Sequence, residues 1–100
     1  MTQATTPTFV LTLPGSVDLS LAENVYFSLC QNAISIVKET NDLLISGNVV
    51  SVYLSQVDTV RLIPGTAQIQ LNWTYADKSR ACSNIISVKI DENLLKDVVP

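Results

Sequence analysis

The sequence predicts an antiparallel β-sandwich of about seven strands. Three observations support this prediction. Short segments in which apolar and polar residues alternate recur along the chain, and turn-forming residues bound each of them. No long helical pattern separates these segments, so the crossover connections that parallel strands need cannot form. The turns recur at intervals of about ten residues, a spacing typical of sandwiches.

The chain has 100 residues, which is enough for one domain, because each half of a two-domain chain would be too small to build its own core. We therefore expect a flexible N-terminal arm over residues 1–7 and a single sandwich domain over residues 8–100. The two cysteines, Cys30 and Cys82, match no metal-ligand spacing. Since no export signal is visible, we expect both to be small buried hydrophobic residues rather than a disulfide.

The first half of the chain holds five predicted strands. Pro14 and Gly15 end the first of them in a turn. The second and third are close enough in sequence to form a hairpin. Gly47 and Asn48 tolerate the positive φ that the turn between the fourth and fifth requires. The predicted strands cover residues 9–13, 24–30, 32–38, 43–45 and 50–54.

The segment VSVYLSQVDTVRL, residues 50–62, changes from strand-like alternation to a helix-capping pattern in its middle. Ser55 and Asp58 form a variant of the capping box, in which Ser55 accepts from the Asp58 amide and Asp58 reaches back. This predicts one short helical turn near residues 55–61, through which the chain crosses from one sheet to the other. A catalytic elbow at Ser55 would require flanking glycines and a base, and the sequence has neither.

The second half begins with the most regular alternation, TAQIQLNWTY, which predicts a strand over residues 66–75 with Trp73 as the central core aromatic. Residues 76–79 then form a hairpin loop, and a return strand follows over residues 80–90. Two adjacent isoleucines in that strand break the alternation, which indicates a bulge or an outward apolar residue. The remaining segment, DENLLKDVV, is compatible with a helical turn or an edge strand.

Composition excludes several classes of function. A net charge of −3 and six scattered basic residues argue against nucleic acid as a partner. No apolar run approaches the ~20 residues that span a bilayer, and no signal peptide is visible, so we expect no membrane partner and synthesis in the cytoplasm.

Catalytic chemistry has little support in the sequence. Histidine is absent, which removes Ser-His and Cys-His nucleophiles and the commonest neutral metal ligand. No glycine-rich phosphate loop exists. A hydrolase built on carboxylates such as Asp58 and Asp77 is the remaining enzymatic alternative, but these acids lie in predicted caps and turns. We therefore expect no enzyme activity, no metal and no cofactor.

The surface predicts a protein partner. Charged residues are 15% of the chain, against about 25% in a typical soluble domain, so part of the surface is expected to be covered. The outward row of the strand at residues 66–75 is uncharged, as suits a face that another polar surface covers. Three tyrosines fall on predicted outer faces, where tyrosine serves either an interface or a solvated strand. The predicted interface comprises Tyr26, Tyr53, Gln68, Gln70, Asn72, Thr74 and Tyr75.

Several segments together resemble a family of uncharacterised proteins of similar length from tail or structural gene modules of phages and prophages of Gram-positive bacteria. The likeness covers residues 8–96. More loosely, the chain is similar to the immunoglobulin-like domain that opens some phage upper-baseplate proteins. The segments that carry the resemblance are FVLTLPGSVDLS, NVYFSLCQ, VSVYLSQVDT, IQLNWTY and RACSNIISVKIDENLL.

The resemblance implies an immunoglobulin-like sandwich that serves as a non-enzymatic structural protein of a phage virion. As a tail or baseplate component it would dock onto other phage structural proteins or associate with itself. It would be made in the host bacterial cytoplasm and reside in the virion. No functional residue is carried over from the family. The alternative is a module that binds carbohydrate on the host cell surface, with Tyr26, Tyr53 or Tyr75 contacting a cell-wall sugar.

Overall fold

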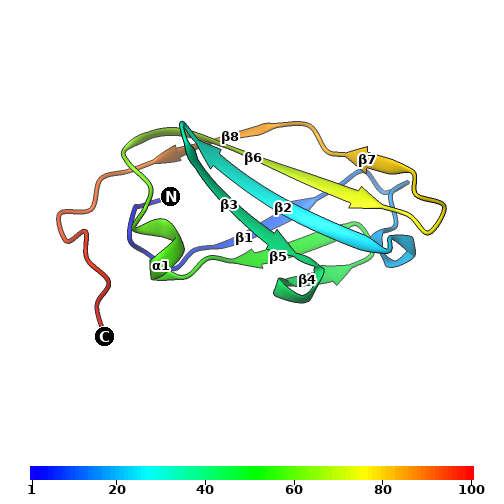
Figure 1. The fold of residues 1–100 in the computed structure, drawn as a ribbon, viewed down its shortest axis with the longest axis horizontal. Helices are drawn as coiled ribbons and strands as arrows, with labels where there is room; N and C mark the ends of the chain where they lie inside the picture. Colours follow the sequence, from blue (N-terminus) through cyan, green and yellow to red (C-terminus); the bar gives the residue numbers. More distant parts are fainter.

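A computed structural model describes residues 1–100 and shows two antiparallel sheets packed face to face (Figure 1). One sheet has three strands in the order β1-β5-β4, and the other has five, in the order β3-β2-β6-β7 with β8 also paired to β6. The predicted β-sandwich is confirmed. The strands are β1 (Thr8–Thr12), β2 (Asn24–Gln31), β3 (Ile34–Glu39), β4 (Leu43–Ser46), β5 (Val49–Tyr53), β6 (Gly65–Thr74), β7 (Arg80–Cys82) and β8 (Ile86–Ile90).

The immunoglobulin-like assignment is not confirmed. In immunoglobulin domains the second strand joins the sheet of the first, fourth and fifth strands. Here β2 pairs with β3 and β6 in the opposite sheet. The predicted hairpin of the second and third strands is present as β2 and β3.

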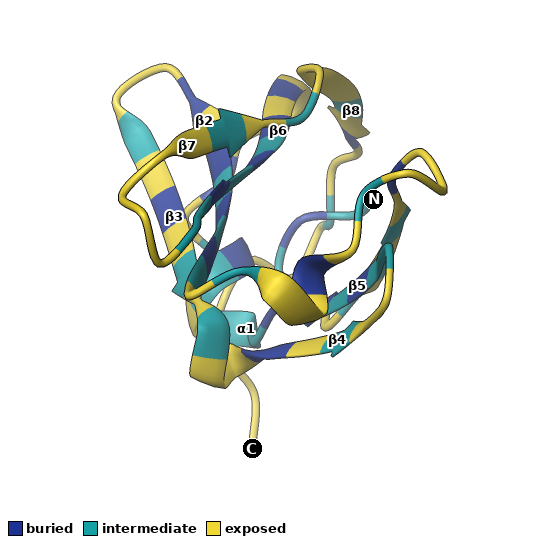
Figure 2. Ribbon diagram, turned by 90° about the vertical axis from the view of Figure 1, so that its right-hand side faces the viewer, coloured by how far each residue is buried: buried dark blue, intermediate teal, exposed yellow.

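The core lies between the inner faces of the two sheets, where buried positions alternate with exposed ones along the strands (Figure 2). It contains 16 buried apolar residues. Phe9 on β1 and Phe27 on β2 stack across the sandwich with ring centroids 6.2 Å apart. Trp73 is 4% exposed, which confirms its predicted place in the core.

The predicted helical turn is α1 (Gln56–Thr59), and both halves of its capping box are present. Asp58 N donates to Ser55 Oγ at 3.3 Å, and Ser55 N donates to Asp58 Oδ2 at 3.0 Å. The chain leaves the three-stranded sheet after β5, passes through α1 and enters the five-stranded sheet at β6. Two short 3-10 helices, η1 (Leu19–Leu21) and η2 (Thr40–Asp42), complete the connections.

The predicted return strand over residues 80–90 is divided into β7 and β8. Asn72 pairs with Cys82 and Ile69 pairs with Ile86, so residues 83–85 lie opposite only residues 70–71. This is a bulge, which increases local twist and re-aims the strand. Ser83 makes the bulge stable, because its N–H donates to Leu71 O and its Oγ accepts from Leu71 N, both at 2.9 Å. The predicted break in alternation is confirmed, while the single continuous strand was wrong.

The N-terminal segment, expected as a flexible arm over residues 1–7, lies against the sandwich. Thr2 forms a parallel bridge with Asp91. Gln3 is 4% exposed, and its Nε2 donates to Leu62 O at 2.6 Å. Beyond this bridge the C-terminal segment 92–100 forms neither of the two structures that its sequence allowed. None of the helices has the length and apolar character that crossing a bilayer requires.

Candidate functional site

Five of the seven predicted interface residues lie together on the outer face of the five-stranded sheet. Tyr26 on β2 is directly opposite Asn72 on β6. Side chains alternate along a strand, so the residues of β2 and β6 that share the parity of Tyr26 and Asn72 also point away from the core. Ser28, which pairs with Gln70, belongs to the same surface. We call this set the polar face: Tyr26, Ser28, Gln68, Gln70, Asn72 and Thr74.

The residues of the polar face are uncharged, and the charged residues around it come from the neighbouring strands, although the Arg80 side chain extends over the face to Asn72. Glu39 on β3 is opposite Tyr26, and Arg80 on β7 is opposite Thr74. Lys89 on β8 lies at the far end of the sheet, beside the start of β6. Amide and hydroxyl groups lose less on desolvation than ions do when they find hydrogen-bond partners. A polar partner can therefore cover most of this face without stripping water from a charge, the exception being the Arg80 guanidinium at Asn72.

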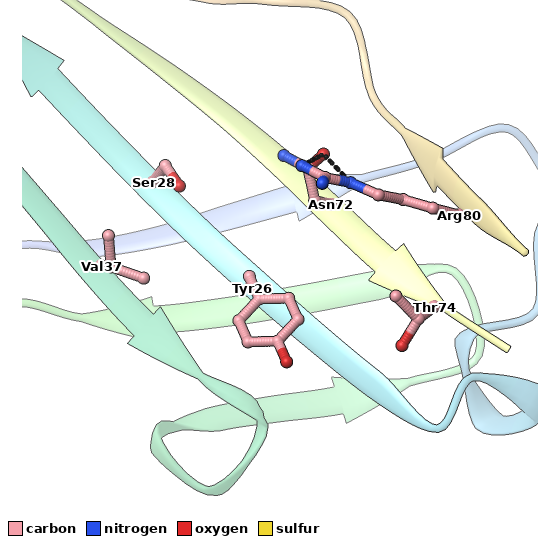
Figure 3. A pocket seen from close by; sticks show the side chains of 6 residues that line it. All are labelled: Tyr26, Ser28, Val37, Asn72, Thr74 and Arg80. Atoms are coloured by element: carbon pink, nitrogen blue, oxygen red, sulfur yellow. Dashed lines mark hydrogen bonds between the residues drawn. The ribbon is translucent and has the colours of Figure 1, made fainter. Parts of the chain in front are cut away.

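A shallow hollow of about 420 Å³ opens on the polar face (Figure 3). Arg80 reaches across from β7, and its Nε and Nη2 donate to Asn72 Oδ1 at 3.3 and 3.0 Å. No carboxylate lies within 4.0 Å of this guanidinium. The remaining N–H groups of Arg80, with the nearby hydroxyl groups, can bind a carboxylate or a sugar hydroxyl. The hollow is lined by Tyr26, Ser28, Val37, Asn72, Thr74 and Arg80.

Two predicted interface residues lie elsewhere. Tyr53 is 58% exposed on the outer face of the three-stranded sheet, opposite Thr8 of β1. Tyr75 packs against the core, and its hydroxyl accepts a hydrogen bond from Trp73 Nε1 at 2.9 Å. The outer-face assignment of Tyr75 was wrong, because Tyr75 lies two residues after Trp73 and therefore shares its inward parity.

Both cysteines are free and exposed, so the prediction that they are buried was wrong. Cys30 has the outward parity of Tyr26 and Ser28 on β2. Cys30 pairs with Gln68 and Cys82 with Asn72, so four residues of β6, about 13 Å of strand, separate the two positions. A disulfide needs Cα atoms within about 7 Å, so the two thiols of one chain do not pair in this fold.

The carboxylates with shifted pKa values act as caps. The hydroxyl and backbone N–H of Ser20 donate to Asp18 at 2.6 and 3.0 Å, and Ser79 donates in the same way to Asp77. These hydrogen bonds lower the pKa of both carboxyl groups. A general acid needs a raised pKa, and these two shift in the opposite direction.

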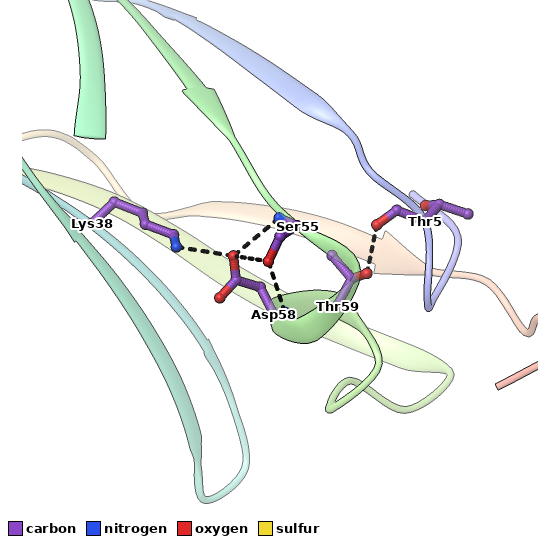
Figure 4. A network of polar contacts seen from close by, with 5 residues as sticks. All are labelled: Thr5, Lys38, Ser55, Asp58 and Thr59. Atoms are coloured by element: carbon purple, nitrogen blue, oxygen red, sulfur yellow. Dashed lines mark hydrogen bonds and ion pairs between the residues drawn. The ribbon is translucent and has the colours of Figure 1, made fainter. Parts of the chain in front are cut away.

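Asp58 is the most enclosed of these acids. Figure 4 shows the polar contacts around it. Burial by itself raises the pKa of Asp58, but hydrogen bonds from Lys38 and from the backbone and hydroxyl of Ser55 outweigh it, and the net shift is downward. Lys38 Nζ lies 2.9 Å from Asp58 Oδ2. The neighbouring Thr59 hydroxyl donates to Thr5 O at 2.6 Å, which fixes α1 to the N-terminal segment. This group of contacts is structural in character.

Sequence reasoning did not identify Ser28, Val37 and Arg80 as parts of the hollow. Ser28 and Val37 have the outward parity of their strands and pair with each other across β2 and β3. Their parity was readable from the sequence, but the register that brings them beside Asn72 was not. Arg80 was read only as the start of the return strand.

Comparisons with family models, curated proteins and solved structures found no match to the chain. The geometry of the polar face and its hollow is therefore the basis on which a function is proposed.

Proposed function

We propose that this protein is a non-enzymatic structural component of a phage virion, a piece of the tail or baseplate that docks onto a larger assembly through the polar face. The observation that carries the proposal is that all the residues of that face are uncharged, while the charged residues around it come from neighbouring strands and only Arg80 is seen to reach in, to Asn72. Sheet faces that meet only water usually mix lysine and glutamate, which also discourages adventitious pairing. Amide and hydroxyl groups suit a face that a polar partner covers.

The acids of the chain support a structural role over turnover. The carboxyl groups of Asp18, Asp58 and Asp77 all have lowered pKa values, so they are ionised at neutral pH. Each accepts hydrogen bonds from a nearby serine that fix a turn or a helix start. Their oxygens are therefore engaged in holding the backbone.

The proposal is tested by the abundance of the chain in purified phage particles. Ser28→Arg fills the hollow of the polar face with a long side chain, opposite Gln70, and adds a second cation beside Arg80. Ser51→Arg is the matched control, because Ser51 has the outward parity of β5, the central strand of the other sheet. We expect wild type and Ser51→Arg to co-purify with particles and Ser28→Arg to be lost from them. Absence of the wild-type chain from particles would contradict the proposal.

A carbohydrate-binding role on the host cell surface is the second candidate. The observation that favours it is the hollow itself, where an aromatic ring, an amide and a guanidinium come together at Tyr26, Asn72 and Arg80. Aromatic rings and such donors are the groups that hold sugars in shallow sites. Binding to isolated host cell-wall polysaccharide, lost in Arg80→Gln, would favour this role over docking. No binding to the polysaccharide would remove it.

A further inference from the structure

The C-terminal tail presents an apolar surface to solvent. Leu94 is 93% exposed, and the three other large apolar residues of the tail are 41 to 57% exposed. Large apolar side chains favour burial, and a cluster of them on a small protein marks a contact site. We call this set the tail patch: Leu94, Leu95, Val98 and Val99.

Polar contacts with the sandwich hold the backbone of the tail while the tail patch stays outside. Val99 N donates to Gln56 Oε1 at 2.9 Å, and Gln56 Nε2 donates back to Val99 O at 3.1 Å. Asn93 is joined to Gln3 by two hydrogen bonds, from Asn93 N at 3.2 Å and from Asn93 Nδ2 at 3.1 Å. Backbone groups of Asn93, Leu95 and Val99 are thus partnered within the chain, while the apolar side chains of the tail stay uncovered.

An apolar groove of about 370 Å³ opens on the same molecule, between the end of β1 and the bulge that separates β7 from β8. Leu13 and Trp73 are the buried residues of its lining, 8% and 4% exposed. Val17 and Ile86 are its more accessible apolar residues. None of its lining residues is charged, so an apolar segment enters it without desolvating an ion. The groove is lined by Thr12, Leu13, Pro14, Val17, Trp73, Cys82, Ser83, Asn84 and Ile86.

The groove and the tail patch lie at opposite ends of the molecule. The molecule measures 46 Å along its longest axis. The C-terminus lies toward one end of this axis, whereas the last residues of β1 and β6 and the first residue of β7 lie toward the other (Figure 1). A tail held by Gln56 and Gln3 therefore lies far from the groove of its own chain. The tail of one copy can reach the groove of a second copy without any change in fold.

We propose that copies of this chain associate head to tail, with the tail patch of one copy seated in the groove of the next. The contact joins two different surfaces, so it is heterologous and extends into a ring or a fibre rather than closing as a two-fold dimer. It leaves the polar face free, so it goes beyond the docking role proposed above and does not depend on it.

Molar mass in solution, measured by light scattering over a range of concentrations, tests this contact. The tail variant is Leu94→Ser/Leu95→Ser, and the groove variant is Ile86→Glu. Val17→Glu, on the loop after β1, serves as a second groove variant in case the strand substitution prevents folding. Leu44→Ser and Val10→Glu are matched controls, since these residues are 77% and 63% exposed and line neither surface.

We expect the mass of wild type and of both controls to rise with concentration, and the tail and groove variants each to remain monomeric. Mixed in equal amounts, the two variants should form a species of two chains and nothing larger. In that mixture one copy keeps an intact groove and the other an intact tail. A wild type that is monomeric throughout, tail and groove variants that associate as wild type does, or a mixture that stays monomeric would each overturn the proposal.

Discussion

Lys38 Nζ lies 2.9 Å from Asp58 Oδ2, and this ion pair joins β3, at the edge of the five-stranded sheet, to α1, through which the chain crosses between the sheets (Figure 4). The two side chains are 23% and 16% exposed. Asp58 also completes the capping box with Ser55. One carboxylate therefore fixes both the start of the helix and its position against the neighbouring sheet.

Replacing Lys38 by methionine should destabilise the protein by about 1 to 2 kcal/mol, because it leaves a partly buried carboxylate without its cation. Urea unfolding of wild type and Lys38→Met measures the change. Lys78→Met is the control, since Lys78 pairs with Glu23 at 4.0 Å with both side chains well exposed. That change should cost less than about 0.5 kcal/mol. Equal effects of the two substitutions would show that enclosure of the Lys38 pair contributes nothing.

The lowered pKa of Asp58 predicts how its contribution depends on pH. Because the folded pKa lies below the unfolded one, folding favours the ionised carboxylate. The contribution is therefore complete above the ordinary carboxyl range, about pH 4, and is lost as pH falls through the lowered folded pKa. The difference in free energy of unfolding between wild type and Asp58→Asn should be constant near neutral pH and shrink in acid. A difference that stays the same down to acid pH would contradict this assignment.

The sequence identified those features that depend on neighbouring residues. Alternation predicted the strands, and Ser55 with Asp58 predicted the capping box. Lys38 is 20 positions from Asp58, and nothing local to either residue indicates that they meet. The two hydrogen bonds from Arg80 to Asn72 likewise depend on the register of β6 with β7. Contacts set by pairing register lie outside what alternation can predict.

Two predictions of side-chain orientation were wrong, each for a different reason. Cysteine is usually buried, yet the parity of β2 turns Cys30 outward with Tyr26 and Ser28. Tyr75 was assigned to the outer face, yet it lies two residues after Trp73 and therefore shares the inward parity of that residue. In the structure the chain turns there, and the Tyr75 hydroxyl meets the indole N–H of the core tryptophan.

The side chain of Gln31 pairs with the backbone of Ile63 as a neighbouring strand would. Its Nε2 donates to Ile63 O at 2.7 Å, and its Oε1 accepts from Ile63 N at 2.9 Å. Gln31 is 4% exposed, so Gln31→Leu should cost about 2 kcal/mol by leaving both groups of Ile63 without partners. Gln56→Leu removes the same pair of bonds from Val99 at an exposed site and should cost less than about 0.5 kcal/mol. Urea unfolding compares them, and similar losses would argue against the role of burial.

Tyr75 contributes to the core through its hydroxyl, which accepts the hydrogen bond of the Trp73 indole. Tyr75→Phe removes the acceptor for Trp73 Nε1, and the indole is nearly buried, so we expect a loss of about 1 kcal/mol. Tyr53→Phe is the control, because Tyr53 is exposed and its hydroxyl makes no hydrogen bond within the chain. Trp73 is the only tryptophan, so its fluorescence follows unfolding in both variants. A Tyr75→Phe protein as stable as Tyr53→Phe would mean that the indole N–H finds water instead, and Tyr75 would again be a candidate for contact with a partner.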